Sequence, residues 1–451
     1  MTPTAEVPHV AVIGGGFSGL AAGYELTKRG VKATVFERDA GIGGLAGSFQ
    51  VNGVQLERFY HHWFTTDEHV MALIDELGTQ DQIIFRPTRT GIYYADKRFN
   101  LSTPFDVLRF KPLPLIDRFR LGLLALRARK VKDWQRLESL TAAEWLRQMG
   151  GDRVYEVVWR PLLRGKFGEH AREVSAVWIS NKLKLRGGSR GKAGDERLGY
   201  YRGGFTALAD RMATRIRDNG GRVLTNSPIE ALVVERGQVT GVNVAGEKIA
   251  VDAAIATPAL PIIADLVEPH TDPEYVARLR RIRYLANLCI VLELDRSLSD
   301  IYWLSVNDPG FPFVAVIEHT NFEPAETYGG RHLCYLSAYL PESAELYQME
   351  DRATVEHTLP HLQRVFPHFK PAWIVASHVW RARFAQPVVE RRYRDLIPAT
   401  ETPLAGLYLA SMAQIYPEDR GTNYAIREGR RVGGHVADAL DKPEMVRFDG
   451  R

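Results

Sequence analysis

Apolar and polar positions alternate in a recognisable order over the first forty residues. Residues 9–13 (HVAVI) form a short apolar run rich in β-branched side chains, which predicts a buried strand. Residues 20–30 (LAAGYELTKRG) have the apolar spacing of a helix, and residues 31–37 (VKATVFE) predict a second strand. A strand, a helix and a strand in this order are typical of an α/β unit with parallel strands.

The rest of the chain changes character twice. Residues 96–197 are mostly helical in pattern, whereas 263–395 carry strand-like runs such as LCIVLEL and HLCYLSAYL. The order of these signals predicts an α/β fold in which a Rossmann-type domain is interleaved with an α+β substrate domain of mixed sheet and helices. We expect the Rossmann-type domain to take 1–95, 198–262 and 396–451, and the substrate domain to take 96–197 and 263–395. Segment 186–197 is rich in glycine and charge, which predicts a surface loop that acts as a lid.

A glycine-rich loop joins the first strand to the first helix. Its sequence is Gly14-Gly15-Gly16-Phe17-Ser18-Gly19. Gly14 allows a tight turn, Gly16 lets the backbone approach a pyrophosphate, and Gly19 allows close packing of helix and strand. Glu37 ends the second strand 18 residues after Gly19, near the offset at which a carboxylate reaches a ribose hydroxyl. The loop therefore predicts a dinucleotide-binding site, and the alternative for Glu37 is an ordinary exposed carboxylate.

Composition narrows the function classes. The 451 residues carry a net charge of +4, which gives no argument for nucleic acid as a partner. No stretch has the ~20 apolar residues of a membrane-spanning helix, and a strand begins too early for a signal peptide, so we expect a cytoplasmic protein. Cys289 and Cys334 lie in apolar runs, and the adjacent His61 and His62 lack a ligand spacing. We therefore expect neither a disulfide nor a metal site.

Segment 109–132 combines cations with a helical apolar pattern. Its cations are Arg109, Lys111, Arg118, Arg120, Arg127, Arg129, Lys130 and Lys132. Leu115, Phe119, Leu123 and Leu126 follow helical spacing. One interpretation is an interfacial helix on an anionic membrane surface, which would place the protein on the inner membrane face. The other is a helix whose apolar side is core and whose cations are solvated.

The stretch VIGGGFSGLAAGYELTKRGVKATVFERDAGIGGLAGSF resembles the opening of the flavin amine oxidase, protoporphyrinogen oxidase and phytoene desaturase superfamily. Segments 220–244, 251–258 and 404–437 resemble later motifs of the same group. The resemblance implies FAD, held non-covalently because SMAQIYP lacks the cysteine that tethers it in some relatives. The implied cofactor-binding residues are Gly14, Gly16, Phe17, Ser18, Gly19, Glu37, Arg38, Gly43, Gly44, Leu45, Ile229, Thr257, Ser411, Arg420, Gly421, Thr422 and Asn423. The last of these begin a helix at about Asn423, whose N-terminus would face the flavin.

Candidate catalytic residues come from the same resemblance. His61 and His62 lie where relatives place a flavin-facing loop, as proton donors or flavin contacts, or else as a structural pair. Trp380, Phe384 and Tyr416 are expected to line the substrate cavity, with core packing as the alternative. Amine oxidases carry a lysine where this chain has Leu288, which weakens an assignment as an amine oxidase.

The leading hypothesis is an FAD-dependent oxidoreductase that moves a hydride between a C–H bond of a lipophilic substrate and flavin N5. The alternatives are a flavin-dependent amine oxidase, a non-redox flavoenzyme resembling UDP-galactopyranose mutase, and a flavin-stabilised partner subunit. The oligomeric state and the substrate's identity do not follow from the sequence.

Overall fold

A parallel sheet built from distant parts of the chain forms one half of the molecule in the computed structural model, which describes residues 7–101, 103–188 and 196–441. The strand order is β10-β2-β1-β14-β20, and every pairing is parallel. The strands are β10 (Arg222–Leu224), β2 (Lys32–Phe36), β1 (His9–Ile13), β14 (Ala253–Ala256) and β20 (Leu407–Leu409).

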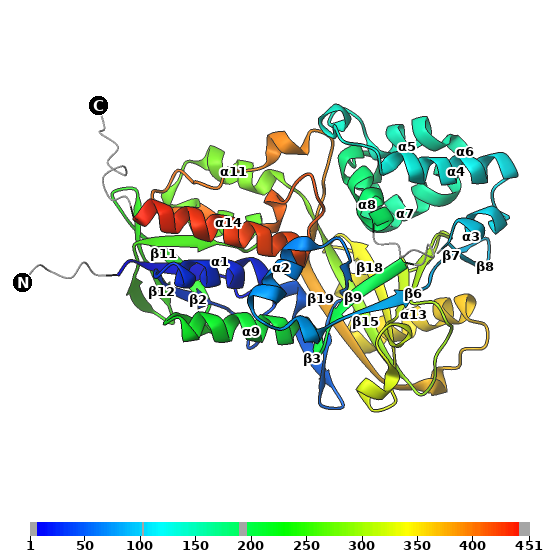
Figure 1. The fold of residues 1–451 in the computed structure, drawn as a ribbon, viewed down its shortest axis with the longest axis horizontal. Coiled ribbons are helices and arrows are strands. Elements are labelled where there is room, and N and C mark those ends of the chain that lie inside the picture. Colours follow the sequence, from blue (N-terminus) through cyan, green and yellow to red (C-terminus); the bar gives the residue numbers. More distant parts are fainter. Residues whose placement is uncertain (1–6, 102, 189–195, 442–451) are drawn as a thin grey trace, which may run out of the picture.

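Both faces of this sheet are buried, which explains why its strands are mostly apolar. Val10 and Val12 of β1 pack in one core with three helices, and Ala11 and Ile13 pack in a second core on the other side. The helices are α1 (Phe17–Lys28), α9 (Gly204–Asp218) and α14 (Thr422–Leu440). Figure 1 shows α1 lying between α14 and α9. The second core is closed by α10 (Leu260–Val267) and by the antiparallel strands β11 (Ile229–Glu235), β12 (Gln238–Val244) and β13 (Glu247–Ala250).

A seven-stranded sheet forms the second half, in the order β19-β15-β18-β17-β16-β7-β8. Its strands are β19 (Ile374–Pro387), β15 (Tyr284–Leu294), β18 (His332–Leu340), β17 (Ala315–Glu318), β16 (Trp303–Val306), β7 (Thr90–Tyr94) and β8 (Lys97–Asn100). All pairings are antiparallel except that of β16 with β7. Helix α13 (Asp351–Val365) packs on one face. The sheet is mixed, as the sequence predicts.

A layer of helices stands beyond this sheet, at the upper right of Figure 1. It contains α3 (Pro104–Arg109), α4 (Leu115–Ala128), α5 (Ala142–Gly150), α6 (Asp152–Val154), α7 (Arg160–Phe167) and α8 (Ala176–Gly188). The expected helix over 109–132 is shorter than predicted and spans Leu115–Ala128, because Pro112 and Pro114 break the chain before it. Residues 189–195 of the expected lid lie outside the described residues.

Small β elements join the two halves. Strand β9 (Glu196–Tyr201) pairs with β5 (Trp63–Phe64) and β6 (Ile83–Thr88), and β3 (Ser48–Val51) pairs with β4 (Val54–Glu57). The parallel sheet draws on the three segments expected for it, but β7, inside the predicted 1–95, belongs to the seven-stranded sheet. The division into two domains stays a prediction. If each domain is defined by its sheet, the first boundary between them falls before residue 90, where β7 begins.

Candidate functional site

The loop between β1 and α1 meets a second glycine-rich loop. Gly14 has a positive φ of 102°, and a Cβ on Gly19 would lie 1.9 Å from the carbonyl oxygen of Gly14, so no side chain fits there. Beside Gly16 the space is open: among the described residues, its Cβ would meet no atom closer than the Cα of Gly44, at 3.8 Å. Gly43 bridges to Gly16 and has a φ of 106°. The two loops form an open backbone cradle at the N-terminus of α1, which fits a pyrophosphate.

Glu37 lies directly after β2 and is buried. Its carboxylate accepts hydrogen bonds from the backbone N–H groups of Gly15, at 2.7 Å, and Asp39, at 2.9 Å. The side chain thus fixes the first glycine loop, and the expected ribose contact stays a prediction. Arg38 points the other way, exposed beside Asp39.

Other expected cofactor residues support this end of the sheet. Phe17 is buried against Phe205, so only its backbone is free for a ligand. Ser18 donates to the carbonyl of Ala410 at 2.8 Å, and Thr257 donates to that of Ile13 at 2.8 Å. Ser411 is buried where β20 ends. Ile229 begins β11.

Helix α14 begins where the sequence places it, one residue early at Thr422, after Gly421. Trp63 donates its indole N–H to the hydroxyl of Thr422 at 2.7 Å, and Asn423 accepts from the backbone N–H of Val70 at 3.0 Å. Arg420 donates to the side-chain oxygen of Gln386 at 3.2 Å and to the hydroxyl of Tyr339 at 3.1 Å. These contacts hold the start of the helix at the edge of a cavity.

The cavity measures about 340 Å³ and lies between the halves of the molecule. One wall consists of Leu45 and residues 421–424, which belong to the expected cofactor motifs. Aromatic and apolar side chains form much of the remainder, and they come from α7, α8, the seven-stranded sheet and the residues directly before α7 and β17. Those that line it include Trp159, Leu162, Trp178, Ile179, Leu183, Leu185, Trp303, Val306 and Val314.

His61 and His62 both line this cavity. Burial lowers the pKa of His61 to about 4 and that of His62 to about 3, so both rings are neutral at pH 7. The Nδ1 atom of His61 donates to the carbonyl of Phe59, and Nδ1 of His62 lies 3.0 Å from the hydroxyl of Tyr302. Each neutral ring has one nitrogen in a hydrogen bond and can offer the other to a ligand as a polar contact. Because the rings are neutral, a role as a protonated imidazolium acid is disfavoured.

Trp380, Phe384 and Tyr416 do not line the cavity, contrary to expectation. Successive strand residues point to opposite faces, so along β19 the neighbouring Ala385 faces the cavity in place of Phe384, which packs on Tyr284. Trp380 packs against Phe49 and under the guanidinium of Arg58. Tyr416 packs between Trp134 and Tyr393.

Several charged cavity residues escaped the sequence analysis. Lys166 lies 3.5 Å and Lys182 2.7 Å from the carboxylate of Asp419, and Arg186 pairs with Glu196 at 2.8 Å. Burial raises the pKa of Asp67 to about 6. The helical pattern of 155–186 placed these lysines on helices, but periodicity alone does not show which helix faces meet a loop more than two hundred residues away.

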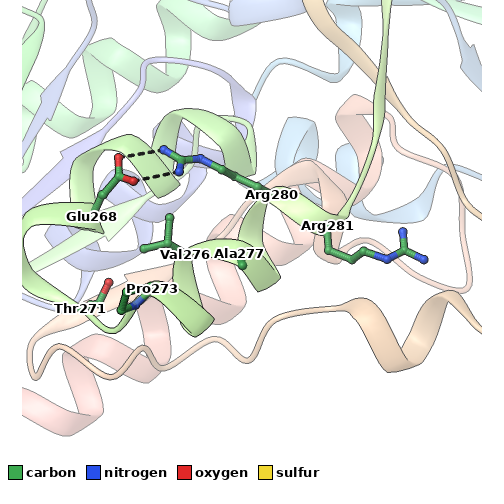
Figure 2. A pocket seen from close by; sticks show the side chains of 7 residues that line it. All are labelled: Glu268, Thr271, Pro273, Val276, Ala277, Arg280 and Arg281. Carbon is green, nitrogen blue, oxygen red and sulfur yellow. Dashed lines mark hydrogen bonds and ion pairs between the residues drawn. The ribbon is translucent and has the colours of Figure 1, made fainter.

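A second hollow is lined by Glu268, Thr271 and residues of α11 (Pro273–Arg281) (Figure 2). Its charges satisfy each other, because Arg280 pairs with Glu268 and Asp265. Within 7–101, 103–188 and 196–441, no three His, Cys, Asp or Glu side chains gather as metal ligands. Both cysteines are buried and unpaired.

Comparison with known proteins agrees with this geometry. The model of one family, described as flavin containing amine oxidoreductase, matches residues 17–436. The 15-cis-phytoene desaturase of Synechococcus elongatus is 23% identical over 80% of this chain and 81% of its own. Protoporphyrinogen oxidase 2 of Arabidopsis thaliana is 28% identical over 35% of this chain, a match that spans 32% of that protein's length. A Mycobacterium tuberculosis relative, assigned as a flavin-containing monoamine oxidase, is matched over 60% of its length at 25% identity.

Solved structures share the fold. Reduced UDP-galactopyranose mutase superposes with a TM-score of 0.74 at 16% identity, covering 96% of each chain. Cyclohexylamine oxidase from Brevibacterium oxydans superposes with a TM-score of 0.69 at 17% identity, covering 96% of this chain and 100% of that one. At these identities the likeness concerns the fold alone.

Proposed function

This chain belongs to the flavin containing amine oxidoreductase family and its cofactor is FAD, and we propose that it transfers a hydride between a C–H bond of a lipophilic substrate and flavin N5. The glycine cradle at Gly16 and Gly44 would hold the pyrophosphate of the cofactor, and Glu37 would keep that loop in shape. The N-terminus of α14 offers free backbone N–H groups to a partly negative ring system.

One observation carries this proposal: the cavity has a cofactor-motif wall and a broad apolar, aromatic remainder. A lipophilic substrate would gain about 25 cal/mol for each Å² of apolar surface it buries there. Polar groups elsewhere in the lining, such as His61 and Tyr60, would orient the substrate. Names of relatives such as phytoene desaturase are consistent with a lipophilic substrate.

The test is an anaerobic titration. Lipid that co-purifies with the protein is extracted and identified by mass spectrometry. Its reduced form is then mixed with the holoenzyme in the oxidised state, and its oxidised form with the holoenzyme in the reduced state. Loss or return of flavin absorbance with one lipid, with a matching change of two hydrogens in its mass, is the expected result. Flavin that responds to dithionite and oxygen but to no lipid would contradict the lipophilic substrate.

An exposed apolar face supports a membrane as the source of that substrate. Nine large hydrophobic side chains are exposed in the part of the chain that the structure describes, and seven of them lie on α3 and α4. We call these seven the α3–α4 face: Phe105, Leu108, Leu115, Ile116, Phe119, Leu123 and Leu126. Asp117, Leu121, Leu124 and Ala128 occupy the buried side of α4. The apolar residues singled out in 109–132 therefore do not form the core side of the helix, contrary to one of the two interpretations.

We propose that the α3–α4 face rests on an anionic lipid surface, on the inner face of a membrane. The cations of 109–132 surround it, and Arg109, Lys111, Arg127, Arg129, Lys130 and Lys132 are exposed. Helix α4 packs on α8, whose side chains line the cavity, so lipid surface and cavity would belong to one helical layer. Among the described residues, no helix is both long and apolar enough to cross a membrane.

A further inference from the structure

The wall of the cavity next to α14 carries a cluster of positive charge. Lys166 comes from α7, Lys182 from α8, and Arg420 from the loop before α14. All three line the cavity, and Asp419 lies within ion-pair distance of both lysines. We call these four residues the Asp419 cluster.

The cluster has two more cations than carboxylates. Lys182 takes the close contact with Asp419, at 2.7 Å, while Lys166 stays at 3.5 Å. Within the described part of the chain, Arg420 donates hydrogen bonds to two neutral groups, the side chains of Gln386 and Tyr339. Arg186 and Glu196, elsewhere on the cavity wall, neutralise each other. Asp67 is the remaining carboxylate of the described lining and is attracted by Lys182, so the lining as a whole has one cation in excess. Charge that is shielded from water and unpaired is costly unless a ligand balances it.

Burial and neighbouring charge shift the pKa values of two groups here, Lys166 and Tyr339. Burial lowers the pKa of Lys166, against the opposing attraction of Asp419. Burial acts to raise the pKa of the Tyr339 phenol, yet Arg420 and Lys166 hold that pKa below its ordinary value. The cluster thus stabilises a negatively charged oxygen where the Tyr339 hydroxyl lies, between Arg420 and Lys166.

We infer that Lys166, Lys182 and Arg420 bind the anionic group of an amphipathic substrate, whose apolar part occupies the aromatic remainder of the cavity. This inference rests on the proposed function and narrows its substrate class to a lipophilic phosphate, sulfonate or carboxylate. The indole N–H groups of Trp159 and Trp178, which line the same cavity, have no acceptor among the described residues. A protonated amine would instead meet like charges, which disfavours amines despite the family's name.

Four probes separate charge from apolar contact: decanesulfonate, decanol, decyltrimethylammonium and inorganic sulfate. Calorimetric titration of the FAD-loaded protein is expected to give the tightest binding for decanesulfonate, about tenfold or more over decanol. Equal binding of decanesulfonate and decanol, or preference for decyltrimethylammonium, would overturn the anion site. Sulfate that binds as tightly as decanesulfonate would overturn the amphipathic part, because the alkyl chain would then contribute nothing.

Variants locate the site. Lys166→Met and Lys182→Met each replace the ammonium group by an unbranched apolar side chain one atom shorter, and should weaken decanesulfonate about tenfold while leaving decanol unchanged. Lys182→Arg, which keeps the positive charge, should retain binding. Lys184→Met is the matched control, because Lys184 is exposed on the same helix and is not part of the cavity wall. An equal loss in the control would overturn the assignment to these lysines.

The flavin reports separately on the proposed function in the same samples. Retained FAD that the co-purified lipid still reduces or reoxidises, in protein that binds no decanesulfonate, would overturn the anion site and leave hydride transfer standing. Binding of decanesulfonate with no flavin response to any lipid would overturn hydride transfer and leave the anion site standing.

Discussion

At the scale of single residues, two buried carboxylates show how the chain uses charge away from solvent. Glu37 and Glu57 are both buried. Glu37 accepts hydrogen bonds from two backbone N–H groups, whereas Glu57 accepts one from the backbone N–H of Phe205 and one from the hydroxyl of Tyr200. Glu37 holds the glycine loop and Glu57 holds the first turn of α9. Their removal should therefore have different consequences, one for the cofactor and one for folding.

Replacing Glu37 by alanine removes the acceptor for the N–H groups of Gly15 and Asp39. We expect FAD to bind more weakly by about 1–3 kcal/mol, the cost of leaving buried polar groups unpaired. Quenching of FAD fluorescence on titration of the apoprotein measures the dissociation constant. Lys32→Ala, at the exposed start of the same strand, is the control. An unchanged dissociation constant in Glu37→Ala would remove Glu37 from the site.

Glu57 makes stability depend on pH. Burial raises the pKa of its carboxyl to about 7, while the N–H of Phe205 and the hydroxyl of Tyr200 bind its two oxygens. A raised folded-state pKa stabilises the protein fully below the unfolded value, near 4.5, and this contribution is lost as pH rises to about 7. The Glu57→Gln variant cannot ionise at this position. The difference in Tm between the variant and the wild type should therefore shift in favour of the variant as pH rises from 4.5 to 7, and should stay constant above pH 7. Glu247→Gln, at an exposed position, is the control and should show no such trend. If the difference in Tm between Glu57→Gln and the wild type stayed constant from pH 4.5 to 7, the raised pKa would be refuted.

At the scale of elements, α1 and α14 pack with their backbones close together. A Cβ on Gly429 would lie 2.1 Å from the carbonyl oxygen of Ser18, and one on Gly433 would lie 2.8 Å from that of Ala22. Neither neighbour can move without moving a helix. The glycines of α14 thus set its distance from α1, and with it the position of Thr422 and Asn423 at the cavity.

Gly429→Ala should therefore force the two helices apart. Overpacking of this kind typically costs about 1–3 kcal/mol, and we expect a lower Tm together with weaker retention of FAD. Gly434→Ala is a matched control on the same helix, because its Cβ would meet only the flexible end of the Arg29 side chain. Thermal unfolding followed by flavin fluorescence measures both effects. Equal Tm values for the two variants would show that helix spacing is not set at Gly429.

Elements also mark how far the sequence could predict the fold. The glycine loop, the parallel strands and the start of α14 depend on local patterns, and the structure has them within a residue or two. Phe384 was misplaced because strand alternation assigns faces only when the register is known, and Ala385 faces the cavity. Lys166 and Lys182 were missed because they meet Asp419 through the packing of α7 and α8, which no periodicity reveals.

At the scale of the whole molecule, the α3–α4 face stands apart from the rest of the surface. Of the nine exposed large hydrophobic side chains, only Val7 and Val375 lie elsewhere among the described residues. An apolar patch of this kind on an otherwise polar surface is typical of an interaction site. The cations around it favour an anionic partner, which we propose is the surface of a lipid membrane.

The protein should therefore co-sediment with vesicles that contain an anionic lipid and detach as salt rises. Each cation near such a surface contributes about 1 kcal/mol at low salt, so a few of them suffice for measurable binding. Reversing the charges of Arg127, Arg129 and Lys130 should release the protein and leave FAD in place, because the glycine loops lie on other elements. The same reversal at the exposed Arg211, Arg236 and Arg278 is the control.

The apolar part of the face makes a separate contribution. Leu115→Asn together with Phe119→Asn removes two side chains that are 64% and 66% exposed, so folding should be little affected. Vesicle binding at high salt, where charge attraction is screened, should then fall further than it does for the charge variant. Equal binding to neutral and anionic vesicles would show that the face binds lipid by apolar insertion alone. A wild-type protein that binds neither neutral nor anionic vesicles would remove the membrane, and the lipophilic substrate would then depend on the cavity alone.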